Sequence, residues 1–308
     1  MADFQGVKMS PDMFEHLIGA STGIRNMDYT WRDIALYNLS IGCKREDSPY
    51  FFERDVRGLK AFPSFAVIPY LNNVTMRIIT PEPDGTNEIY RDHLKSLLGT
   101  MPNGLHMAME MHFDVPLDPY GGTFVVKDHL NNILDRGEGK GTVADCGMDV
   151  WDQAGRHIAE LHSYHLSKAF GGFGGPEFKA PKVVYPDRPP DVEKTEYMIP
   201  EIAAFYRLVG DTYRVHVDFE YAKSCGYPAP FNMGMCTYGY GVRMIAHELI
   251  PYEPERITYL YAQVRSLCFP GQNVTAQAWQ AEPGVMYWKL LNQEGNVLIG
   301  NGIMKYKI

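Results

Sequence analysis

Two separate blocks of the chain alternate apolar and polar residues with a period of two, and this pattern limits the fold most strongly. Because successive side chains of a strand point to opposite faces, such stretches predict strands that are buried on one face. Turn residues such as Asp118-Pro119 and Pro283-Gly284 separate neighbouring stretches, which favours antiparallel pairing across short connections. The stretches cover residues 105–115, 123–130, 141–151 and 157–166 in the first block, and 257–264, 273–279, 285–291 and 297–304 in the second.

A segment with helical spacing precedes each block of strands. In the second half, apolar residues recur at intervals of four and three, which is typical of a long buried helix. These residues are Phe231, Met235, Tyr238, Val242, Ile245 and Leu249. Gly234, Gly239 and Gly241 fall within this segment, where each glycine costs roughly 1 kcal/mol relative to alanine. We therefore expect a sheet or a ligand to approach the helix backbone closely.

Shorter helical patterns complete the two halves. Residues 29–37 have helical spacing with Thr30 as the expected N-cap, and residues 62–71 predict a helix or part of one. Residues 201–208 predict a short helix, and Asp218 is expected to cap another. Each half therefore consists of helix followed by four antiparallel strands, which predicts an α+β fold with a weak internal repeat.

The chain length and the distribution of glycine and proline predict two domains. The 308 residues, 45% of them hydrophobic, suffice for two units of about 150 residues, each with its own core. Glycine and proline concentrate in residues 171–191, and we interpret the later part of this segment as the linker. The glycine run at 171–175 is not followed by the Lys-Ser or Lys-Thr of a phosphate-binding loop, which favours a compact turn. The predicted domains are residues 1–180 and 181–308.

Composition and charge argue against nucleic-acid binding and against a membrane span. The net charge is −8 without a long basic run, and no apolar stretch reaches the length of a spanning helix. The five cysteines are scattered and form no C-x-x-C pair, which suits reduced thiols inside a cell. The first residues lack a secretory pattern, and the last five, MKYKI, are not an S-K-L type address. We expect an intracellular protein of the peroxisomal matrix or the cytoplasm.

An acid and an imidazole, Asp211 and His216, lie five positions apart on a predicted turn. Together they can hold and polarise a water molecule, because the carboxylate orients the ring and the ring relays a proton. The same spacing fits a capped turn in which Asp211 accepts backbone hydrogen bonds and His216 fills a gap in the core. Spacing alone favours the capped turn, whereas the surrounding residues favour the pair that polarises a water.

Those surrounding residues resemble the hydratase 2 motif of the MaoC-like hot-dog enzymes, the (R)-specific 2-enoyl-CoA hydratases. That motif runs Tyr-x-x-x-Gly-Asp-x-Asn-Pro-x-His-x-Asp and is followed, after a short helix, by His-Gly. The matching residues are Tyr206, Gly210, Asp211, His216, Asp218 and Gly234. Two places depart from it, because Tyr213 and Arg214 replace the Asn-Pro and Met233 replaces the histidine.

Further stretches extend the resemblance over nearly the whole chain. Residues 29–42, 62–68, 171–175 and 264–271 look like those of the two-hot-dog eukaryotic members. The resemblance implies a double hot dog, in which two antiparallel sheets each wrap around a long helix. It also implies hydration of trans-2-enoyl-CoA to (R)-3-hydroxyacyl-CoA in fatty-acid β-oxidation.

The resemblance assigns roles to three residues. Asp211 and His216 would activate the water, and the backbone N–H of Gly234 would stabilise the thioester oxygen at the start of the long helix. Plain packing of the helix on the sheet is the other interpretation of Gly234, and the residues alone favour neither. No metal or other cofactor is expected, since CoA is part of the acyl-CoA substrate. A homodimer is expected.

Three other residues of the motif have two interpretations each. Tyr206 hydrogen-bonds the pair or the substrate, or it is an amphipathic core residue, which we slightly favour. Asp218 fits a helix cap in a supporting role better than a catalyst. Met233 either reshapes the substrate pocket or removes a supporting hydrogen bond.

The first half lacks the acid and the imidazole at the matching place, so we expect it to make room for the acyl chain. The candidate lining residues are Phe62, Phe65 and Ile68. Its strand-like segments contain His106, His157, His162 and His165. Strand alternation puts His162 and His165 on opposite faces, which argues against a metal site, and we expect surface or edge positions for these histidines.

Three other functions stay open on the sequence alone. The chain could be an acyl-thioester dehydratase of a biosynthetic pathway, a specialised lyase on a branched or polyketide-like thioester, or a non-catalytic acyl-CoA-binding hot-dog protein. A hot-dog thioesterase fits less well, because its arrangement differs from the hydratase motif. An absorbance assay with crotonyl-CoA separates an enzyme from a binding protein.

Overall fold

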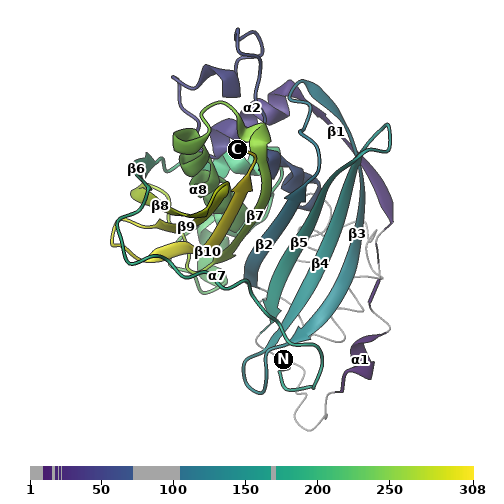
Figure 1. Ribbon diagram of the computed structural model, residues 1–308. Coiled ribbons are helices and arrows are strands. Elements are labelled where there is room, and N and C mark those ends of the chain that lie inside the picture. Colours follow the sequence, from purple (N-terminus) through teal and green to yellow (C-terminus); the bar gives the residue numbers. More distant parts are fainter. Residues whose placement is uncertain (1–9, 16–17, 20, 22, 72–104, 168–170) are drawn as a thin grey trace.

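The computed structural model describes residues 10–15, 18–19, 21, 23–71, 105–167 and 171–308. Within these residues, ten strands form one continuous antiparallel sheet in the order β1-β3-β4-β5-β2-β7-β10-β9-β8-β6 (Figure 1). The first half contributes β1 (Ile24–Thr30), β2 (Leu105–Phe113), β3 (Gly121–Asp135), β4 (Thr142–Asp152) and β5 (His157–Ser167). The second half contributes β6 (Val192–Met198), β7 (Ile257–Val264), β8 (Gln272–Glu282), β9 (Val285–Leu291) and β10 (Val297–Tyr306).

The two halves of the sheet repeat the same strand order outward from the centre. Next to β2 come β5, β4, β3 and β1, and next to β7 come β10, β9, β8 and β6. At the centre, β2 and β7 pair antiparallel with Met109 opposite Ala262. The α+β double hot-dog arrangement is confirmed, with the two predicted sheets joined as one.

Each half contains five described strands, whereas the alternation predicted four. The additional strands, β1 and β6, are the outer edges of the sheet. Most residues of β1 are exposed or half-buried, and β6 carries Glu193, Lys194 and Glu196. Because an edge strand pairs on one side and buries little apolar surface, its alternation signal is weak.

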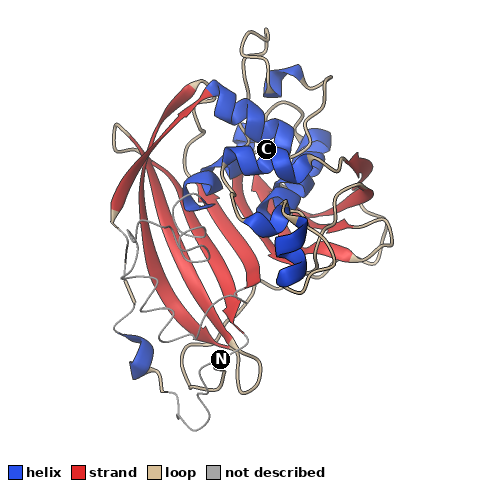
Figure 2. Ribbon diagram, turned by 180° about the vertical axis from the view of Figure 1, so that it is seen from behind, coloured by secondary structure: helices blue, strands red, loops and turns tan. Residues whose placement is uncertain are grey.

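Helices cover one face of the sheet (Figure 2). The longer ones are α2 (Trp31–Ser40), α6 (Ile202–Val209), α7 (Phe219–Ser224) and α8 (Gly234–Leu249), and the short ones are α1 (Asp12–Glu15) and α3 (Ile68–Tyr70). Thr30 caps α2 as predicted, since its hydroxyl accepts from the N–H of Arg32 at 3.2 Å. Asp33 completes the cap by accepting from the N–H of Thr30 at 2.7 Å.

Helix α8 is the buried centre of the second half, as its apolar spacing predicted. A Cβ at Gly239 would lie 2.7 Å from Cγ2 of Ile41, and one at Gly241 would lie 2.8 Å from the ring of Trp288. Ordinary side chains do not pack at such distances. Gly241 therefore allows the predicted close approach of the sheet, and Gly239 allows a close approach of the C-terminal end of α2, which the sequence did not predict.

Most buried apolar residues of both halves form one continuous cluster in the described part of the chain, and Ala108, Tyr259 and Tyr261 form a small second one. The expectation of a separate core for each half is therefore wrong. The cause is that α2 packs against α6 and against α8, across the junction of the halves. A buried hydrogen bond crosses the same junction, because Arg243 donates to the carbonyl of Ile41 at 3.2 Å. Within the second half, Arg243 also donates to Glu196 at 2.8 and 2.9 Å. The domain boundary near residue 180 stays a prediction.

Two further segment predictions can be compared with the structure. Residues 62–71, predicted as a helix or part of one, form a 3-10 turn (Pro63–Val67) and the short helix α3, and residues 72–104 lie outside the described part. In the glycine run, the carboxylate of Asp135 accepts from the N–H groups of Gly172 and Gly174 at 2.8 Å each, which confirms a compact turn.

Two other expectations from composition can be compared with the described residues. None of the helices described is long and apolar enough to cross a membrane. All five cysteines carry free thiols, and four of them are buried while Cys225 is exposed.

Candidate active site

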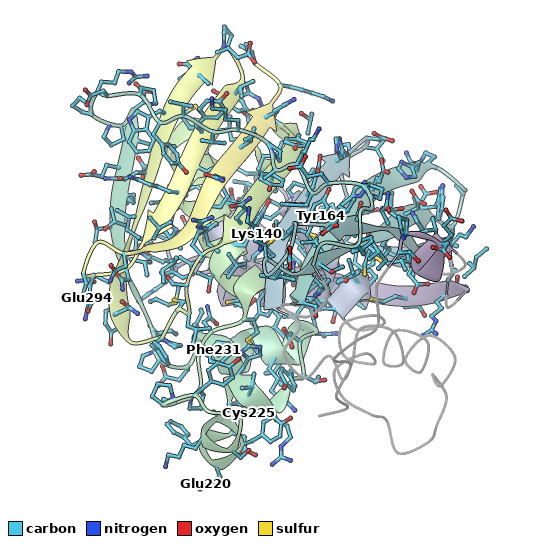
Figure 3. All side chains as sticks on the ribbon, turned by 90° about the horizontal axis from the view of Figure 1, so that it is seen from below. Lys140, Tyr164, Glu220, Cys225, Phe231 and Glu294 are labelled. Atoms are coloured by element: carbon cyan, nitrogen blue, oxygen red, sulfur yellow. The ribbon has the colours of Figure 1, made fainter. Side chains whose placement is uncertain are left out.

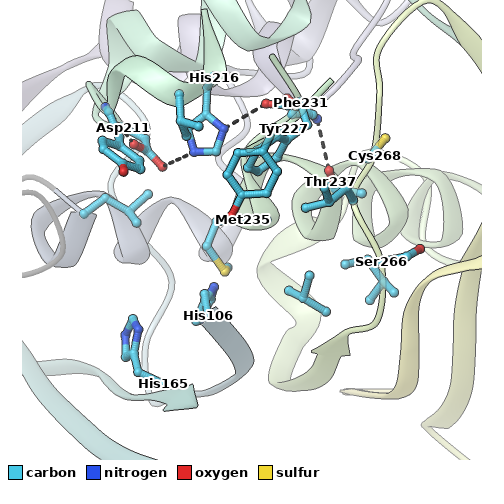
Figure 4. A pocket seen from close by; sticks show the side chains of 18 of the residues that line it. His106, His165, Asp211, His216, Tyr227, Phe231, Met235, Thr237, Ser266 and Cys268 are labelled. Carbon is cyan, nitrogen blue, oxygen red and sulfur yellow. Dashed lines mark hydrogen bonds and ion pairs between the residues drawn. The ribbon is translucent and has the colours of Figure 1, made fainter. Parts of the chain in front are cut away.

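A cavity of about 470 Å³ lies where the two halves meet on the helical side of the sheet (Figure 4). Most of its second-half wall comes from residues 211–237, and the first half contributes Tyr70, Leu71, His106, Ser163 and His165. Viewed from below, Cys225 and Phe231 lie on the part of the second half that projects from the sheet with α7, whose outer end carries Glu220 (Figure 3).

Asp211 and His216 occupy the loop between α6 and α7 and line this cavity. Asp211 accepts a hydrogen bond from the N–H of Tyr213 at 3.2 Å. His216 ends a 3-10 turn, and its Nδ1 contacts the carbonyl oxygen of Phe231 at 2.8 Å. Since a carbonyl only accepts, Nδ1 carries the proton and Nε2 keeps a free lone pair. That Nε2 lies 4.0 Å from Oδ2 of Asp211.

Burial shifts the pKa values of this pair in opposite directions. It raises the pKa of Asp211, although the charge of His216 and the N–H of Tyr213 oppose the shift. It lowers the pKa of His216, although the charge of Asp211 and the hydrogen bond to the Phe231 carbonyl oppose the shift. His216 is therefore neutral at physiological pH, with Nε2 ready to accept a proton.

The gap between Nε2 of His216 and Oδ2 of Asp211 suits a shared water molecule. The two atoms are both acceptors, and 4.0 Å is too long for a direct hydrogen bond. A water at about 2.8 Å from each atom would make roughly a right angle between its two hydrogen bonds, which a bent water molecule accommodates. The pair can thus hold a water by both hydrogens and leave its oxygen lone pairs toward the cavity.

Gly234 is the first residue of α8, and it lines the cavity beside the pair. The first N–H groups of a helix have no carbonyl partner within the helix, and the helix dipole adds positive potential at this end. A Cβ at Gly234 would lie 3.3 Å from Cγ2 of Val264 and 3.6 Å from Nδ1 of His106. The absence of that Cβ lets a ligand oxygen lie against the backbone N–H.

Two family models match the chain, one in each half. Residues 27–167 match the family model of the MFE-2 hydratase 2 N-terminal domain, and residues 182–298 match that of the MaoC like domain. The chain belongs to the MaoC-like hydratase 2 family. It is 25% identical to the probable enoyl-CoA hydratase 2 of Dictyostelium discoideum, over 91% of this chain and 92% of that protein.

A further relative and a solved structure are similar to the chain over nearly its whole length. The chain is 27% identical to the 3-hydroxyacyl-thioester dehydratase Y of Mycobacterium tuberculosis, over 94% of this chain and 97% of that protein. The crystal structure of a MaoC-like dehydratase from Phytophthora capsici matches with a TM-score of 0.79 at 28% identity, covering 96% of this chain and 98% of that one. Both comparisons span the two halves of the hydratase 2 fold.

Two hydratase 2 motif residues lie away from the cavity wall. Tyr206 is wholly buried, its ring lies 5.9 Å from that of Tyr37, and its hydroxyl has no hydrogen-bond partner among the described residues. Asp218 caps α7 by accepting from the N–H of Tyr221 at 2.9 Å, and it pairs with Arg214. These positions support the interpretations as a core residue and as a helix cap.

Met233 is also absent from the residues that line the cavity. Its side chain is fully buried in the core, and its carbonyl accepts from the N–H and the hydroxyl of Thr237 at 3.0 Å each. The neighbouring Asn232 lines the cavity instead and donates to the Thr237 hydroxyl at 3.1 Å. The departure from the family pattern at residue 233 therefore changes packing beneath the helix start rather than the cavity wall.

The expected first-half lining residues are wrong. Phe62, Phe65 and Ile68 are fully buried in the core and are not among the residues that line the cavity. The next residues along the chain, Tyr70 and Leu71, line it instead. Sequence spacing could not make this distinction, because residues 62–71 are all buried, whether they face the core or the cavity.

The expected surface or edge positions of the first-half histidines are wrong for His106 and His165. Both lie on inner strands of the sheet and line the cavity. His162 lies on the opposite face, as alternation predicted, and its Nδ1 is 3.0 Å from Asp145. The described residues contain no group of three or more side chains that could hold a metal ion.

Proposed function

We propose that this chain hydrates trans-2-enoyl-CoA to (R)-3-hydroxyacyl-CoA in fatty-acid β-oxidation, as a hydro-lyase. The observation that carries the proposal is the Asp211–His216 pair, with its 4.0 Å gap, in the same cavity as the start of α8. Similarity to proteins named enoyl-CoA hydratase 2 and 3-hydroxyacyl-thioester dehydratase supports the same chemistry. In this proposal residues 181–308 carry the reacting groups and residues 1–180 complete the cavity.

The reaction adds the elements of water across the double bond. The water held by Asp211 and His216 attacks Cβ, and Nε2 of His216 takes one of its protons. The electron pair of the double bond moves toward the thioester oxygen, which accepts a hydrogen bond from the N–H of Gly234. The proton then passes to Cα as the electron pair returns, so the residues finish in their starting states and no cofactor is consumed.

Dehydration is the same reaction in reverse and uses the same groups. One relative, from Mycobacterium tuberculosis, is named a 3-hydroxyacyl-thioester dehydratase, which favours this direction as the second candidate. A non-catalytic binding protein is less consistent with the site, because the replaced residue Met233 lies outside the cavity wall and Arg214 pairs with Asp218. The third replaced residue, Tyr213, lines the cavity, donates its N–H to Asp211 and places its ring 5.9 Å from that of His216.

Absorbance of the conjugated thioester tests the proposal directly. We expect crotonyl-CoA and longer trans-2-enoyl-CoAs to lose this absorbance when the purified chain is added, and the product to be the (R)-3-hydroxy isomer by chiral chromatography. Activity should survive dialysis against a chelator, since the proposed steps use only protein groups. Absence of turnover with every chain length, or an (S) product, would contradict the proposal.

Assembly and location are proposed alongside the activity. We propose a homodimer in the peroxisomal matrix or the cytoplasm. Light scattering at several protein concentrations measures the mass in solution, and a mass corresponding to the single 34.9 kDa chain would contradict the dimer.

A further inference from the structure

The first-half wall of the cavity is polar where a plain alkyl chain would favour an apolar one. His106 on β2 pairs directly with His165 on β5, and their ring centroids lie 5.2 Å apart. The pairing register shifts between His106 and Ala108, which marks a bulge, and bulges re-aim neighbouring side chains. Both imidazoles face the cavity from below, opposite His216 (Figure 4). We call this wall the histidine recess and define it by Tyr70, His106, Ser163 and His165.

Within the histidine recess, His165 already has partners. Its Nε2 lies 2.8 Å from the hydroxyl of Tyr70 and 2.9 Å from that of Ser163. Only 8% of its surface is exposed. His165 is therefore held in place by hydrogen bonds within the protein, and it supports the ring beside it.

His106 differs because its buried Nε2 has no hydrogen-bond partner among the described residues. A hydrogen bond to the backbone of Ala108 favours the protonated ring, as expected when a ring N–H donates to a carbonyl. Since Nε2 is unpartnered, Nδ1 is the donor in that bond, and Nε2 is left with a lone pair. Burial lowers the pKa of His106 to about 4, so the ring is neutral near pH 7 and Nε2 acts only as an acceptor.

The position of His106 limits which part of a substrate can reach it. Its Nδ1 lies 3.6 Å from where a Cβ of Gly234 would be, so the ring is close to the proposed site of the thioester oxygen. That oxygen is an acceptor and cannot pair with the lone pair of Nε2. Nε2 is already buried without a partner, and an alkyl segment beside it would leave it unsatisfied, whereas a donor would satisfy it. The group that fits is a hydrogen-bond donor on the acyl chain close to the double bond.

We propose that the histidine recess selects hydroxylated acyl chains, so that the preferred substrate is a trans-2-enoyl thioester with a hydroxyl group a few carbons beyond the double bond. This inference rests on the proposed hydratase function and names its substrate class. The hydroxyl donates to Nε2 of His106. The neighbouring His165, itself held by hydrogen bonds to Tyr70 and Ser163, keeps the His106 ring in position. Hydroxyl recognition of this kind discriminates through the penalty on the unsubstituted analogue.

A matched series of substrates tests the selection on the unmodified protein. The series contains trans-2-octenoyl-CoA, its 4-, 5- and 6-hydroxy derivatives, and the corresponding methyl ethers. We expect at least one hydroxy derivative to have a kcat/KM about 10- to 100-fold above the parent, the effect of satisfying one buried acceptor. The methyl ether at that position should show no gain, because it cannot donate. A parent substrate equal to or better than every hydroxy derivative would overturn the proposal, and so would an equally favoured ether.

Substitutions at residue 106 sharpen the test. His106→Leu removes the acceptor, so the preference for the hydroxy derivative should disappear while kcat/KM for the unsubstituted octenoyl-CoA rises. His106→Gln places an amide near the position of Nε2 and should retain part of the preference. His112→Leu is the matched control, since His112 lies on the same strand with an exposed side chain and is not among the residues that line the cavity. An unchanged preference in His106→Leu would contradict the proposal, and the wild-type series decides alone if that variant does not fold.

Failure of the proposed function gives a different result. If no thioester is hydrated, crotonyl-CoA included, the hydratase assignment fails. Equilibrium binding then tests whether the histidine recess prefers a hydroxylated acyl chain. Calorimetry would then compare octanoyl-CoA with its 4-, 5- and 6-hydroxy derivatives. Tighter binding of a hydroxy derivative supports the recess as a hydroxyl site, and equal binding overturns it.

Discussion

The pairs Asp47–His247 and Asp211–His216 contain the same two residue types and differ in their protonation. Oδ1 of Asp47 lies 2.9 Å from Nε2 of His247, and this hydrogen bond raises the pKa of the histidine. The pKa of Asp47 is lowered, because its hydrogen bonds to His247 and to the N–H of Lys44 outweigh burial. In the other pair the atoms are 4.0 Å apart, burial dominates, and both pKa values shift the opposite way.

This contrast shows which feature separates an ion pair from a group that can transfer a proton. Asp47 follows α2 in the first half as Asp211 follows α6 in the second, but its histidine comes from α8 rather than from its own loop. Direct contact stabilises the charged forms and leaves no space for a third molecule. In the second pair, the Phe231 carbonyl already holds Nδ1 of His216, so Nε2 stays free for a water.

The largest expected effect comes from breaking the separated pair. Asp211→Asn and His216→Ala should each lower kcat by about 10²- to 10⁴-fold, the usual contribution of a general acid–base group. The double variant should lose much less than the product of the two, because the residues act as a unit. Initial rates with crotonyl-CoA measure the effect, and circular dichroism checks the fold.

Asp47→Asn and His247→Gln are the matched controls for those variants. They change the same residue types in the ion pair, outside the cavity wall. Both should keep kcat within about threefold of the wild type, roughly 0.6 kcal/mol. Wild-type turnover in the two cavity variants, with the fold intact, would place the chemistry elsewhere in the molecule.

The pH dependence of the rate should report the lowered pKa of His216. A base is active when unprotonated, so kcat/KM should fall on the acid side with a midpoint below 6.5, the ordinary histidine value. In Asp211→Asn the carboxylate no longer favours the protonated ring, so the midpoint should move to still lower pH. Stopped-flow rates across the acid range measure both profiles. A midpoint above 6.5 would mean that His216 behaves like His247.

The sequence predicted the parts of this arrangement that depend on short spacings. The two caps at Thr30 and Asp218 and the extent of α8 follow from neighbouring residues, so local patterns sufficed. Asp211 and His216 are also close in sequence, which is why their pairing in one loop was predictable. Their 4.0 Å separation was not, since the Phe231 carbonyl that holds the ring comes from fifteen residues further along.

The histidine recess shows what local patterns cannot supply. His106 and His165 become neighbours only because β2 pairs with β5 in one particular register, with a bulge between His106 and Ala108. Alternation separates the faces of a strand, but it does not say which face meets the cavity. The edge strands β1 and β6 were missed for a different reason, because each pairs on one side only and buries little apolar surface.

Thermal stability should separate the two pairs with opposite signs. For Asp47–His247, the raised histidine pKa contributes stability that is fully present below pH 6.5 and is lost as pH rises through the folded value. The lowered pKa of Asp47 contributes stability present above 3.8 and lost as pH falls through the folded value. Asp47→Asn should therefore cost most between these limits, roughly 1 kcal/mol.

His216 should behave in the opposite way in the same experiment. Its folded pKa is lowered, so the wild type loses stability as pH falls below 6.5, where the unfolded chain binds the proton more readily. His216→Gln removes that loss, and its Tm relative to the wild type should rise toward acid pH. Melting curves at a series of pH values measure both variants, and parallel curves for the two would contradict the assigned protonation states.

The smallest expected effect on activity is that of Met233→His, which restores the family residue beside the pair. The side chain is buried in the core beneath the start of α8, and it does not line the cavity. An imidazole in that position would lie in the core rather than on the cavity wall. We therefore expect kcat within about tenfold of the wild type, at most near 1.4 kcal/mol. A lower Tm is expected as well, because a buried ring nitrogen without a partner costs roughly 1–3 kcal/mol.

Met235→His is a useful comparison, since Met235 lines the cavity and its replacement should change kcat/KM more strongly. A gain of several orders of magnitude in Met233→His would show that the natural chain is an impaired hydratase, and the acyl-CoA-binding function would then be the better assignment.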